Sequence, residues 1–235
     1  MDRSTVSWRN TTHDWARSVD ADHLALVREN GAFFAPGGLP HLLLEVLAYA
    51  ADEAECLGGG RCTVTLYADG SVSVADEGRG TDTRFDDHGR PVKKPVMATK
   101  DLRFFDHPDA QVLPDGHPRR GMSVVAALSE WLVHTNRRAG GAWAQRYVHG
   151  VPATGLTPVA DDGTTGTTVH FSPAEALPAL PALPALPALP ALPALPALTV
   201  LPALTASWPH LSVEIDDRRA RSPRTSQSAE SRDRP

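Results

Sequence analysis

Apolar and polar side chains alternate most regularly between residues 63 and 75. Thr63 to Tyr67 and Ser71 to Ala75 each place apolar side chains at alternate positions, as in a β-strand that buries one face. The residues between these segments, Ala68-Asp69-Gly70, are typical of a tight turn. The pattern therefore predicts a β-hairpin.

The strongest helical pattern runs from Leu39 to Cys56. Pro36-Gly37-Gly38 interrupts the chain before this segment, and Gly58-Gly59-Gly60 ends it. Its apolar side chains recur at spacings of three and four residues, which places them on one face of an α-helix: Leu39, Leu42, Leu43, Val46, Leu47, Ala50 and Ala54.

Weaker patterns predict the other elements. A short helix is expected around Asp20 to Arg28, and a second amphipathic helix from Gly121 to Trp131. The segment from Thr81 to Pro118 has no periodicity, which indicates a long functional loop or a partly disordered segment. The further strands expected are Leu132 to Asn136, Trp143 to Val148, Gly166 to Phe171 and Leu211 to Ile215.

Proline occurs at every third position in most of the apolar stretch from Ala176 to Leu204. Because proline lacks an N–H donor and obstructs the preceding turn, this stretch is expected neither to form an α-helix nor to span a membrane. The Leu-Pro-Ala repeat predicts a linker over residues 176–206, with docking to a proline-binding domain as the alternative. Residues 1–20 are expected to be poorly ordered, and residues 220–235 to form a disordered tail.

Length and composition favour one domain in a reducing compartment. The chain has 235 residues, a net charge of −5 and ten histidines, without a long basic run that would indicate a dedicated nucleic-acid binder. The spacing of Cys56 and Cys62 fits neither a redox pair nor half of a zinc site. The first residues contain no apolar core of a signal peptide, so a cytoplasmic location is expected.

A candidate binding site follows the second strand of the predicted hairpin. The chain runs from the strand into Asp76-Glu77-Gly78-Arg79-Gly80. A carboxylate at a strand end, followed by glycines two and four residues later, lets backbone approach a flat ligand while one acceptor points into a pocket. The alternative is a surface turn rich in charge and glycine.

Glu45 is the second candidate because it lies within the apolar run of the long helix. A carboxylate there must lie at a boundary, accept hydrogen bonds or have a perturbed pKa. The alternative is a glutamate at the helix edge in water. His41 is four residues before Glu45, but one such pair is too common to predict a metal site.

Four stretches, taken in order, resemble the N-terminal ATPase domain of DNA gyrase B subunits, within the GHKL family. They are HLLLEVLAYAADEA, SVSVADEGRG, GMSVVAALS, and YVHGVP followed by TGTTVHF, and they carry the resemblance over residues 22–171. The resemblance implies an α/β (α+β) two-layer sandwich of the GHKL or Bergerat type, with a mixed β-sheet and helices on one face. Residues 21–175 would form this domain, and residues 207–219 its closing strand.

The resemblance also implies an adenine site. Asp76 would accept a hydrogen bond from the adenine amino group, and Thr167 would support the same edge. Gly78 and Gly80 belong to the nucleotide-binding turn, where Gly78 would leave room for the ring. Arg79 and Arg138 match arginines at the outer rim.

For the phosphate end, the resemblance implies that Glu45 is the general base that activates water. Gly121 would place a helix N-terminus near the phosphates. Two departures stand out. Tyr49 occupies the position of the family's magnesium-ligating asparagine, and a phenol is a poor Mg²⁺ ligand. The glycine-rich phosphate loop here includes Arg119 and Arg120.

The function expected from the resemblance is ATP binding, as in the ATP-hydrolysing B subunit of a type II topoisomerase, without the transducer and toprim domains. Tyr49 predicts weak or absent hydrolysis and puts Mg²⁺ binding in question; no metal ligands are assigned. The alternative is a catalytically degenerate paralogue that acts as a regulatory or protein-interaction module. The partners implied are ATP and either another protein or a second copy of the chain, with only indirect contact to DNA and none to a membrane.

Overall fold

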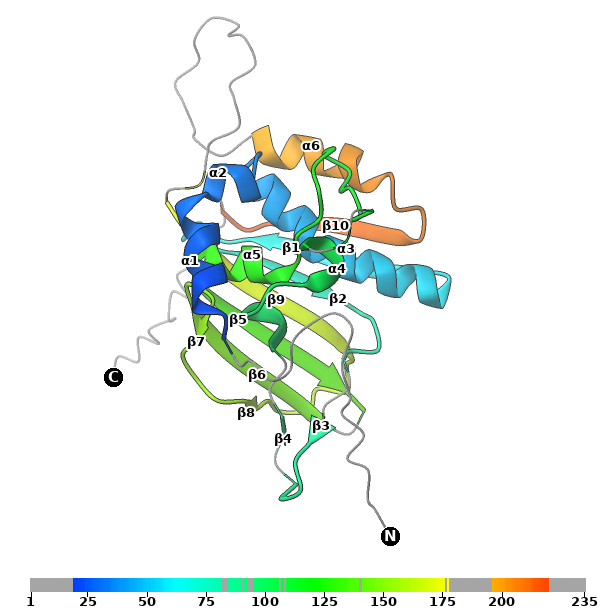
Figure 1. The fold of residues 1–235 in the computed structure, drawn as a ribbon. Helices are drawn as coiled ribbons and strands as arrows, with labels where there is room; N and C mark the ends of the chain where they lie inside the picture. Colours follow the sequence, from blue (N-terminus) through cyan, green and yellow to red (C-terminus); the bar gives the residue numbers. More distant parts are fainter. Residues whose placement is uncertain are drawn as a thin grey trace, which may run out of the picture.

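A mixed β-sheet covered by helices forms the fold in the computed structural model (Figure 1). The structure describes residues 19–81, 84–89, 91–92, 95–105, 107, 109–139, 141–175, 177 and 196–219. The expectations for residues 1–18 and 220–235 lie outside these ranges, as does most of the Leu-Pro-Ala repeat.

The main sheet has the strand order β10-β1-β2-β9-β5-β6-β7, and β8 pairs with β6. Its strand β10 is parallel to β1, whereas the other neighbouring pairs are antiparallel. The strands are β1 Gly60–Leu66, β2 Val72–Asp76, β5 Ser129–Arg138, β6 Gly141–Val148, β7 Val151–Pro152, β8 Thr157–Pro158, β9 Gly166–Pro173 and β10 Leu211–Asp217. Two further strands, β3 Arg84–Phe85 and β4 Pro91–Val92, pair only with each other.

The helices pack on one face of the main sheet (Figure 1). This arrangement confirms the predicted two-layer α/β fold with a mixed sheet. The helical segments are α1 Ala21–Glu29, α2 Gly31–Phe34, α3 Leu39–Leu57, the 3-10 turn η1 Pro95–Met97, α4 Leu102–Phe105, α5 Met122–Ala127 and α6 Pro196–Thr205.

Helix α3 follows the predicted boundaries closely. Pro40 lies in its first turn, where a missing N–H donor has no cost, and Gly58 ends the helix in a left-handed conformation with φ of 76°. The apolar stripe of α3 is buried against β1 and β2, so the predicted helix and hairpin are both confirmed.

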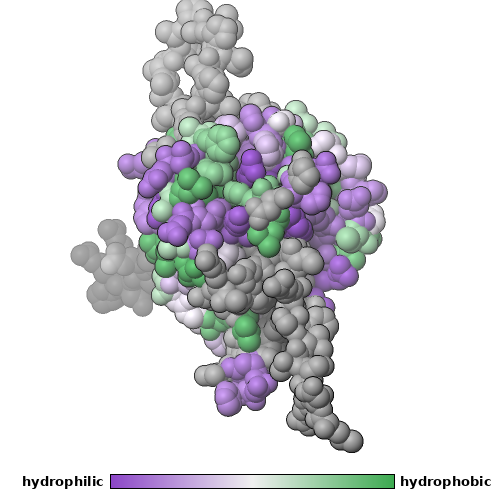
Figure 2. All heavy atoms as spheres, viewed as in Figure 1, coloured by the Kyte–Doolittle hydropathy of each residue, from purple (hydrophilic) through white to green (hydrophobic). Residues whose placement is uncertain are grey.

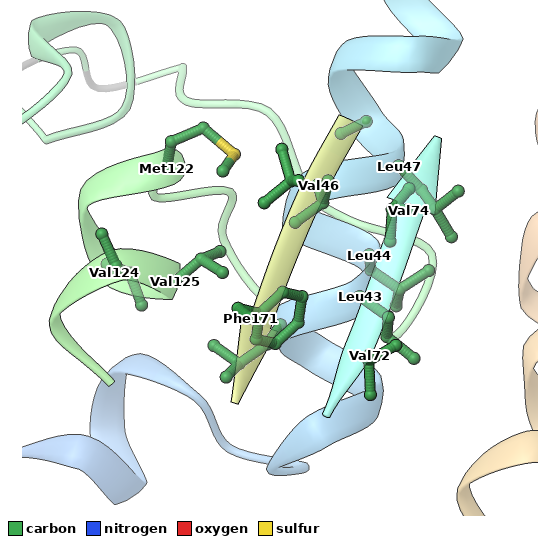
Figure 3. Packing of buried hydrophobic residues seen from close by; sticks show 14 of the residues in the cluster. Leu43, Leu44, Val46, Leu47, Val72, Val74, Met122, Val124, Val125 and Phe171 are labelled. Carbon is green, nitrogen blue, oxygen red and sulfur yellow. The ribbon is translucent and has the colours of Figure 1, made fainter. Parts of the chain in front are cut away.

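The core lies between α3, α5 and the sheet (Figure 3). Leu43 and Leu47 of α3 are fully buried, as are Val125 of α5 and Phe171 of β9. Burying each such side chain stabilises the fold by about 1.5–3 kcal/mol. Packing therefore holds α3 and α5 in fixed positions over the strands.

The second predicted helix is shorter than expected. Helix α5 ends at Ala127, and β5 begins at Ser129, so the expectation of helix through Trp131 was wrong. Trp131 pairs with Val148 of β6 and Ser172 of β9. Hydrogen bonds to strands on both sides favour the extended conformation over another helical turn.

The expectation that proline excludes a helix was wrong at the end of the Leu-Pro-Ala tract. Helix α6 contains Pro202 in its interior. Proline there costs about 3 kcal/mol relative to alanine, but Leu201 is fully buried in the core and offsets part of that cost. The hydroxyl group of Thr205 also donates to the carbonyl oxygen of Leu201 at 3.0 Å.

In the described parts of the segment from Thr81 to Pro118, the elements are short: β3, β4, η1 and α4. Several of its described side chains are nevertheless buried, including Met97, Asp101, Phe104 and Leu113. These residues pack this part of the segment against the helices and the sheet.

Hydrophilic and hydrophobic side chains are interspersed on the face of the molecule shown in Figure 2. Leu26 of α1 and Phe33 of α2 are among the exposed large hydrophobic residues. In the described part of the chain, no helix is long and apolar enough to cross a membrane.

Candidate functional site

A cavity of about 340 Å³ lies between α3, the sheet and the segment that follows β2. Side chains of α3 form one wall, and the strands β2, β9, β5 and β6 form the floor. The described lining residues are Val46, Tyr49, Ala50, Asp52, Glu53, Cys56, Val74, Asp76, Gly80, Thr81, Val92, Val96, Met97, Met122, His134, Asn136, Trp143, Gln145, Tyr147, Leu156, Thr167 and Val169.

The floor consists of side chains that are neighbours across the strands. Val169 of β9 pairs with His134 of β5, and His134 pairs with Gln145 of β6. A second row joins Thr167, Asn136 and Trp143 in the same way. The floor is therefore apolar on β2 and β9 and becomes polar towards β6.

Asp76 is the last residue of β2 and lies at the edge of this cavity. Its Oδ1 accepts a hydrogen bond of 2.9 Å from the N–H of Gly78, and the N–H of Thr167 also stabilises the carboxylate. Burial nevertheless raises the pKa of Asp76, because a buried charge loses hydration. The site thus has a half-buried carboxylate beside an apolar floor.

Gly78 lets the turn after β2 pack closely against α3. A Cβ atom there would lie 2.8 Å from Oδ1 of Asp76 and 2.9 Å from Cγ of Glu53. Arg79 binds Glu53 through two side-chain hydrogen bonds of 2.7 and 2.9 Å, which lower the pKa of Glu53. The turn is therefore anchored to α3 by an ion pair at the rim, in which Glu53 belongs to the cavity lining and Arg79 does not.

Gly80 and Thr81 anchor the other end of the turn to β5. Asn136 accepts hydrogen bonds from the N–H and the hydroxyl of Thr81, and it donates to the carbonyl of Thr81. Gly80 has φ of 70°, and a Cβ atom there would overlap the carbonyl oxygen of Arg137. Arg138 donates to the carbonyl of Gly80 at 3.1 Å, so it also holds this turn.

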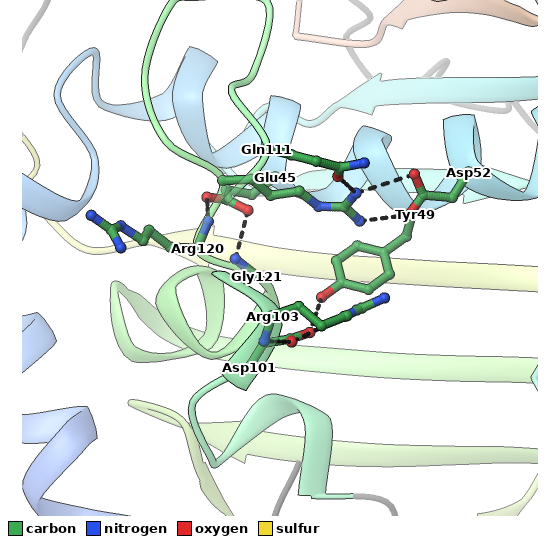
Figure 4. Close-up of polar contacts among 9 residues, drawn as sticks. Glu45, Tyr49, Asp52, Asp101, Arg103, Gln111, Arg120 and Gly121 are labelled. Atoms are coloured by element: carbon green, nitrogen blue, oxygen red, sulfur yellow. Dashed lines mark hydrogen bonds and ion pairs between the residues drawn. The ribbon is translucent and has the colours of Figure 1, made fainter. Parts of the chain in front are cut away.

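Glu45 lies one helical turn before Tyr49 on α3 and is not among the residues that line the cavity. Its carboxylate is fully buried and accepts hydrogen bonds from the N–H groups of Arg120 and Gly121 at 2.6 and 2.7 Å (Figure 4). The structure therefore ties Glu45 to the start of α5. Of the predicted site residues, Asp76, Gly80 and Thr167 line the cavity, whereas Glu45 and Gly121 do not.

His41 connects Glu45 to the loop before α5. Its Nδ1 and Oδ2 of Asp115 are 2.6 Å apart, and its Nε2 lies 3.6 Å from Oε1 of Glu45, which is an ion-pair distance. Burial alone would lower the pKa of His41, but the two carboxylates overcome that effect and raise it to about 9. Asp115 has a lowered pKa because His41 stabilises its charged form against the opposing effect of burial.

A buried arginine occupies the region beyond Tyr49. The guanidinium of Arg119 lies 4.5 Å from the ring centroid of Tyr49 and 4.6 Å from that of Phe104, and its side chain is only 2% exposed. Asp52 binds it with N–O distances of 3.1 and 2.9 Å, and Gln111 accepts a third contact at 2.7 Å. Tyr49, Phe104 and Arg119 together are called the Arg119 stack below.

The residues around Tyr49 do not fit a divalent cation. Burial raises the pKa of Tyr49, so its hydroxyl remains neutral, and this hydroxyl lies 3.5 Å from Oδ2 of Asp101 (Figure 4). Asp101 already binds Arg103 in a bidentate pair, and Asp52 binds Arg119. A metal ion there would face two guanidinium groups and a phenol. Among the described residues, no group of three His, Cys, Asp or Glu side chains is placed to hold a metal ion.

Sequence reasoning missed the polar part of the cavity floor on β5 and β6: His134, Asn136, Trp143 and Gln145. The signal was present, because polar or amphipathic residues recur at alternate positions of β5 and β6 on the face that packs towards the helices. It also missed Asp52 and Glu53 of α3.

The fold and the cavity together define a class of domain: a mixed sheet with helices on one face and a pocket between the longest helix and a strand-end aspartate. This arrangement is similar to the topoisomerase IV ATP-binding domain of Francisella tularensis, solved with a small-molecule inhibitor, at a TM-score of 0.51. That match has 24% sequence identity and covers 66% of this chain and 42% of the solved chain. It supports the fold assignment.

Sequence comparison finds similarity to the B subunits of DNA topoisomerase 4 and DNA gyrase. The B subunit of DNA topoisomerase 4 from Staphylococcus epidermidis is 36% identical over 137 residues, and the mitochondrial DNA gyrase B subunit of Arabidopsis thaliana is 37% identical over 145 residues. Each match covers 58% of this chain, and the chain spans about a fifth of these relatives' length, 21% and 20% respectively. No model of a protein family matches the chain. The resemblance to the gyrase B ATPase domain is therefore confirmed.

Proposed function

We propose that the chain is an adenine-nucleotide-binding domain of the gyrase B type, and that Asp76 recognises the base. The observation that carries the proposal is the position of this carboxylate, half-buried at the edge of a cavity with an apolar floor. An ionised carboxylate only accepts hydrogen bonds, so it pairs with the exocyclic amino group of adenine. Similarity to an ATP-binding domain supports ATP as the ligand.

The cavity offers the other contacts that a purine requires. Val46 of α3 and Val169 of β9 line opposite sides of the cavity and suit the two faces of a flat ring. Thr167 lies beside Asp76 and provides a second polar group at the same edge. Gly78 acts in this proposal by letting the turn close around Asp76, and Arg79 and Arg138 hold that turn at the rim.

Binding without turnover is the form of this function that the contacts favour. A general base at Glu45 needs a free carboxylate oxygen within hydrogen-bond distance of a water molecule. Glu45 is fully buried, and each of its oxygens already accepts a backbone N–H group. These contacts favour a regulatory or protein-interaction module over an ATP-hydrolysing enzyme. Four further properties of the chain remain predictions: binding to a protein partner, self-association, indirect contact with DNA and a cytoplasmic location.

The test compares adenosine with purine riboside, which lacks only the exocyclic amino group. Because a ligand that binds the folded state raises the thermal midpoint, both are titrated with the wild-type chain and with Asp76→Asn. We expect wild-type protein to bind adenosine at least about tenfold more tightly than purine riboside, since the unpaired carboxylate costs more than 1 kcal/mol. Asp76→Asn should remove this preference.

Glu77→Gln is the matched control, because it removes the charge of the adjacent, exposed carboxylate. It should leave the preference for adenosine unchanged. The proposal is wrong if neither adenosine nor millimolar ATP shifts the midpoint of the wild-type chain, or if Asp76→Asn retains the wild-type preference.

A further inference from the structure

The charge of the cavity lining does not suit a triphosphate. Its described lining residues include the carboxylates of Asp52, Glu53 and Asp76, and they include neither lysine nor arginine. Phosphate groups are bound in proteins by cationic side chains or by free backbone N–H groups. Arg119 and Arg79 neutralise Asp52 and Glu53, but the described lining itself offers no cationic side chain to a phosphate group and so favours a neutral ligand.

The two arginines of the loop before α5 do not compensate for this lack. Arg119 is 2% exposed, and its guanidinium is engaged by Asp52, Gln111 and the rings of the Arg119 stack. Arg120 donates to the carbonyl of Phe104 and lines a separate cavity with Phe33 and Lys100. Neither guanidinium lines the cavity beside Asp76.

The backbone at the start of α5 is also occupied. The N–H groups of Arg120 and Gly121 donate to Glu45. The hydroxyl of Tyr49 lies 3.1 Å from the position that a Cβ atom of Gly121 would take, so the phenol covers this glycine. The donors that a phosphate would need are therefore both paired and covered.

We propose that the cavity binds the nucleoside part of an adenine nucleotide and makes no contact with a metal-bound triphosphate, because the Arg119 stack closes the end where phosphates would lie. This inference rests on the proposed adenine site and narrows its ligand class to a neutral purine nucleoside. A bound nucleotide keeps its phosphates in solvent. Asp52 is paired with the guanidinium of Arg119, which leaves its carboxylate engaged within the protein and not as a ligand of a metal ion.

The experiment is a calorimetric titration of the full wild-type chain with adenosine and with ATP. Each ligand is measured with EDTA and with excess Mg²⁺, at low and at high salt. We expect the dissociation constants of adenosine and ATP to agree within about fivefold, with no effect of Mg²⁺ on either. Salt should change both affinities equally little, because screening acts on charge–charge contacts that the phosphates do not make.

A preference for ATP of more than about fivefold, or a gain in ATP affinity on adding Mg²⁺, would overturn the inference. Two engaged phosphate hydrogen bonds would strengthen ATP binding by about a hundredfold, so the outcomes are well separated. In that case adenosine would still bind, and the adenine site would stand. If neither ligand binds the folded chain, the proposed function fails together with the inference.

A variant gives a second readout that does not depend on absolute affinity. Asp76→Asn should weaken the binding of adenosine and the binding of ATP by the same factor, since both ligands are held through their adenine. A smaller loss for ATP than for adenosine would mean that the phosphates contribute binding energy, which also contradicts the inference.

Discussion

The turn after β2 and the loop before α5 both contact α3, but their polar groups are used differently. In the turn, Asp76 has a raised pKa and borders an open cavity. In the loop, Glu45 and Arg119 are almost completely buried, and each is paired within the protein. Both carboxylates accept two backbone N–H groups, so the comparison teaches that access to a cavity, and not the number of partners, distinguishes the candidate ligand group from the structural one.

The largest difference between the two regions is expected in the free energy of unfolding when Glu45 and Asp76 are each replaced by the corresponding amide. Glu45→Gln replaces an acceptor oxygen with an NH₂ group that faces a backbone N–H, at a fully buried position. We expect it to lower the free energy of unfolding by about 3 kcal/mol, as measured by urea denaturation. Glu55→Gln, on the exposed part of the same helix, is the control and should change stability by less than about 0.5 kcal/mol. A loss at Glu45 no larger than the loss at Glu55 would contradict the buried hydrogen bonds.

A smaller effect should follow from the titration of His41. Because its folded pKa of about 9 exceeds the unfolded value of 6.5, its contribution is complete below pH 6.5 and is lost as the pH rises towards 9. We expect the free energy of unfolding to fall by on the order of 2 kcal/mol between pH 6.5 and 8.5. His41→Gln should flatten this slope.

His23 and His170 have lowered pKa values, so they are neutral in the folded state throughout this pH range and serve as internal controls. A slope that persists in His41→Gln would show that another group causes it.

The ion pair that holds the turn should contribute less to the free energy of unfolding than Glu45 or His41. Arg79 is 59% exposed and Glu53 is 27% exposed, so solvent screens their interaction. Arg79→Gln is expected to cost about 0.5 kcal/mol in thermal unfolding, and high salt should shrink the difference from wild type. A loss above about 2 kcal/mol would mean that the turn is as tightly coupled to the core as the loop before α5.

The smallest effect on stability is expected for Asp76→Asn. Burial raises the pKa of Asp76, so its ionised form destabilises the folded state at neutral pH, and this cost disappears as the pH falls below the unfolded pKa. The amide oxygen can still accept the N–H of Gly78. The free energy of unfolding of the variant at pH 7 should therefore lie within about 0.5 kcal/mol of the wild-type value, or exceed it, although the variant binds adenosine more weakly. A large destabilisation would mean that Asp76, like Glu45, serves to stabilise the fold.

The sequence by itself determined the elements whose pattern is local. The hairpin of β1 and β2 and the helix α3 depend on side-chain periodicity and on glycines at the ends; α3 was predicted nearly to the residue, whereas β1 begins three residues before the predicted strand. The strand-end aspartate was a candidate for the same reason, because its position relative to the strand and the glycines is a property of five consecutive residues, with a surface turn as the alternative.

Only the tertiary structure decided which polar groups remain available to a ligand. Strand pairing on both sides of Trp131 ended α5 early, and burial of Leu201 allowed a helix around Pro202. Glu45 and Asp76 are both acids in apolar surroundings in the sequence, but the fold gives two backbone N–H groups to Glu45 and leaves Asp76 beside a cavity. The physical reason is that hydrogen-bond partners and desolvation come from residues distant in the chain, which no local pattern encodes.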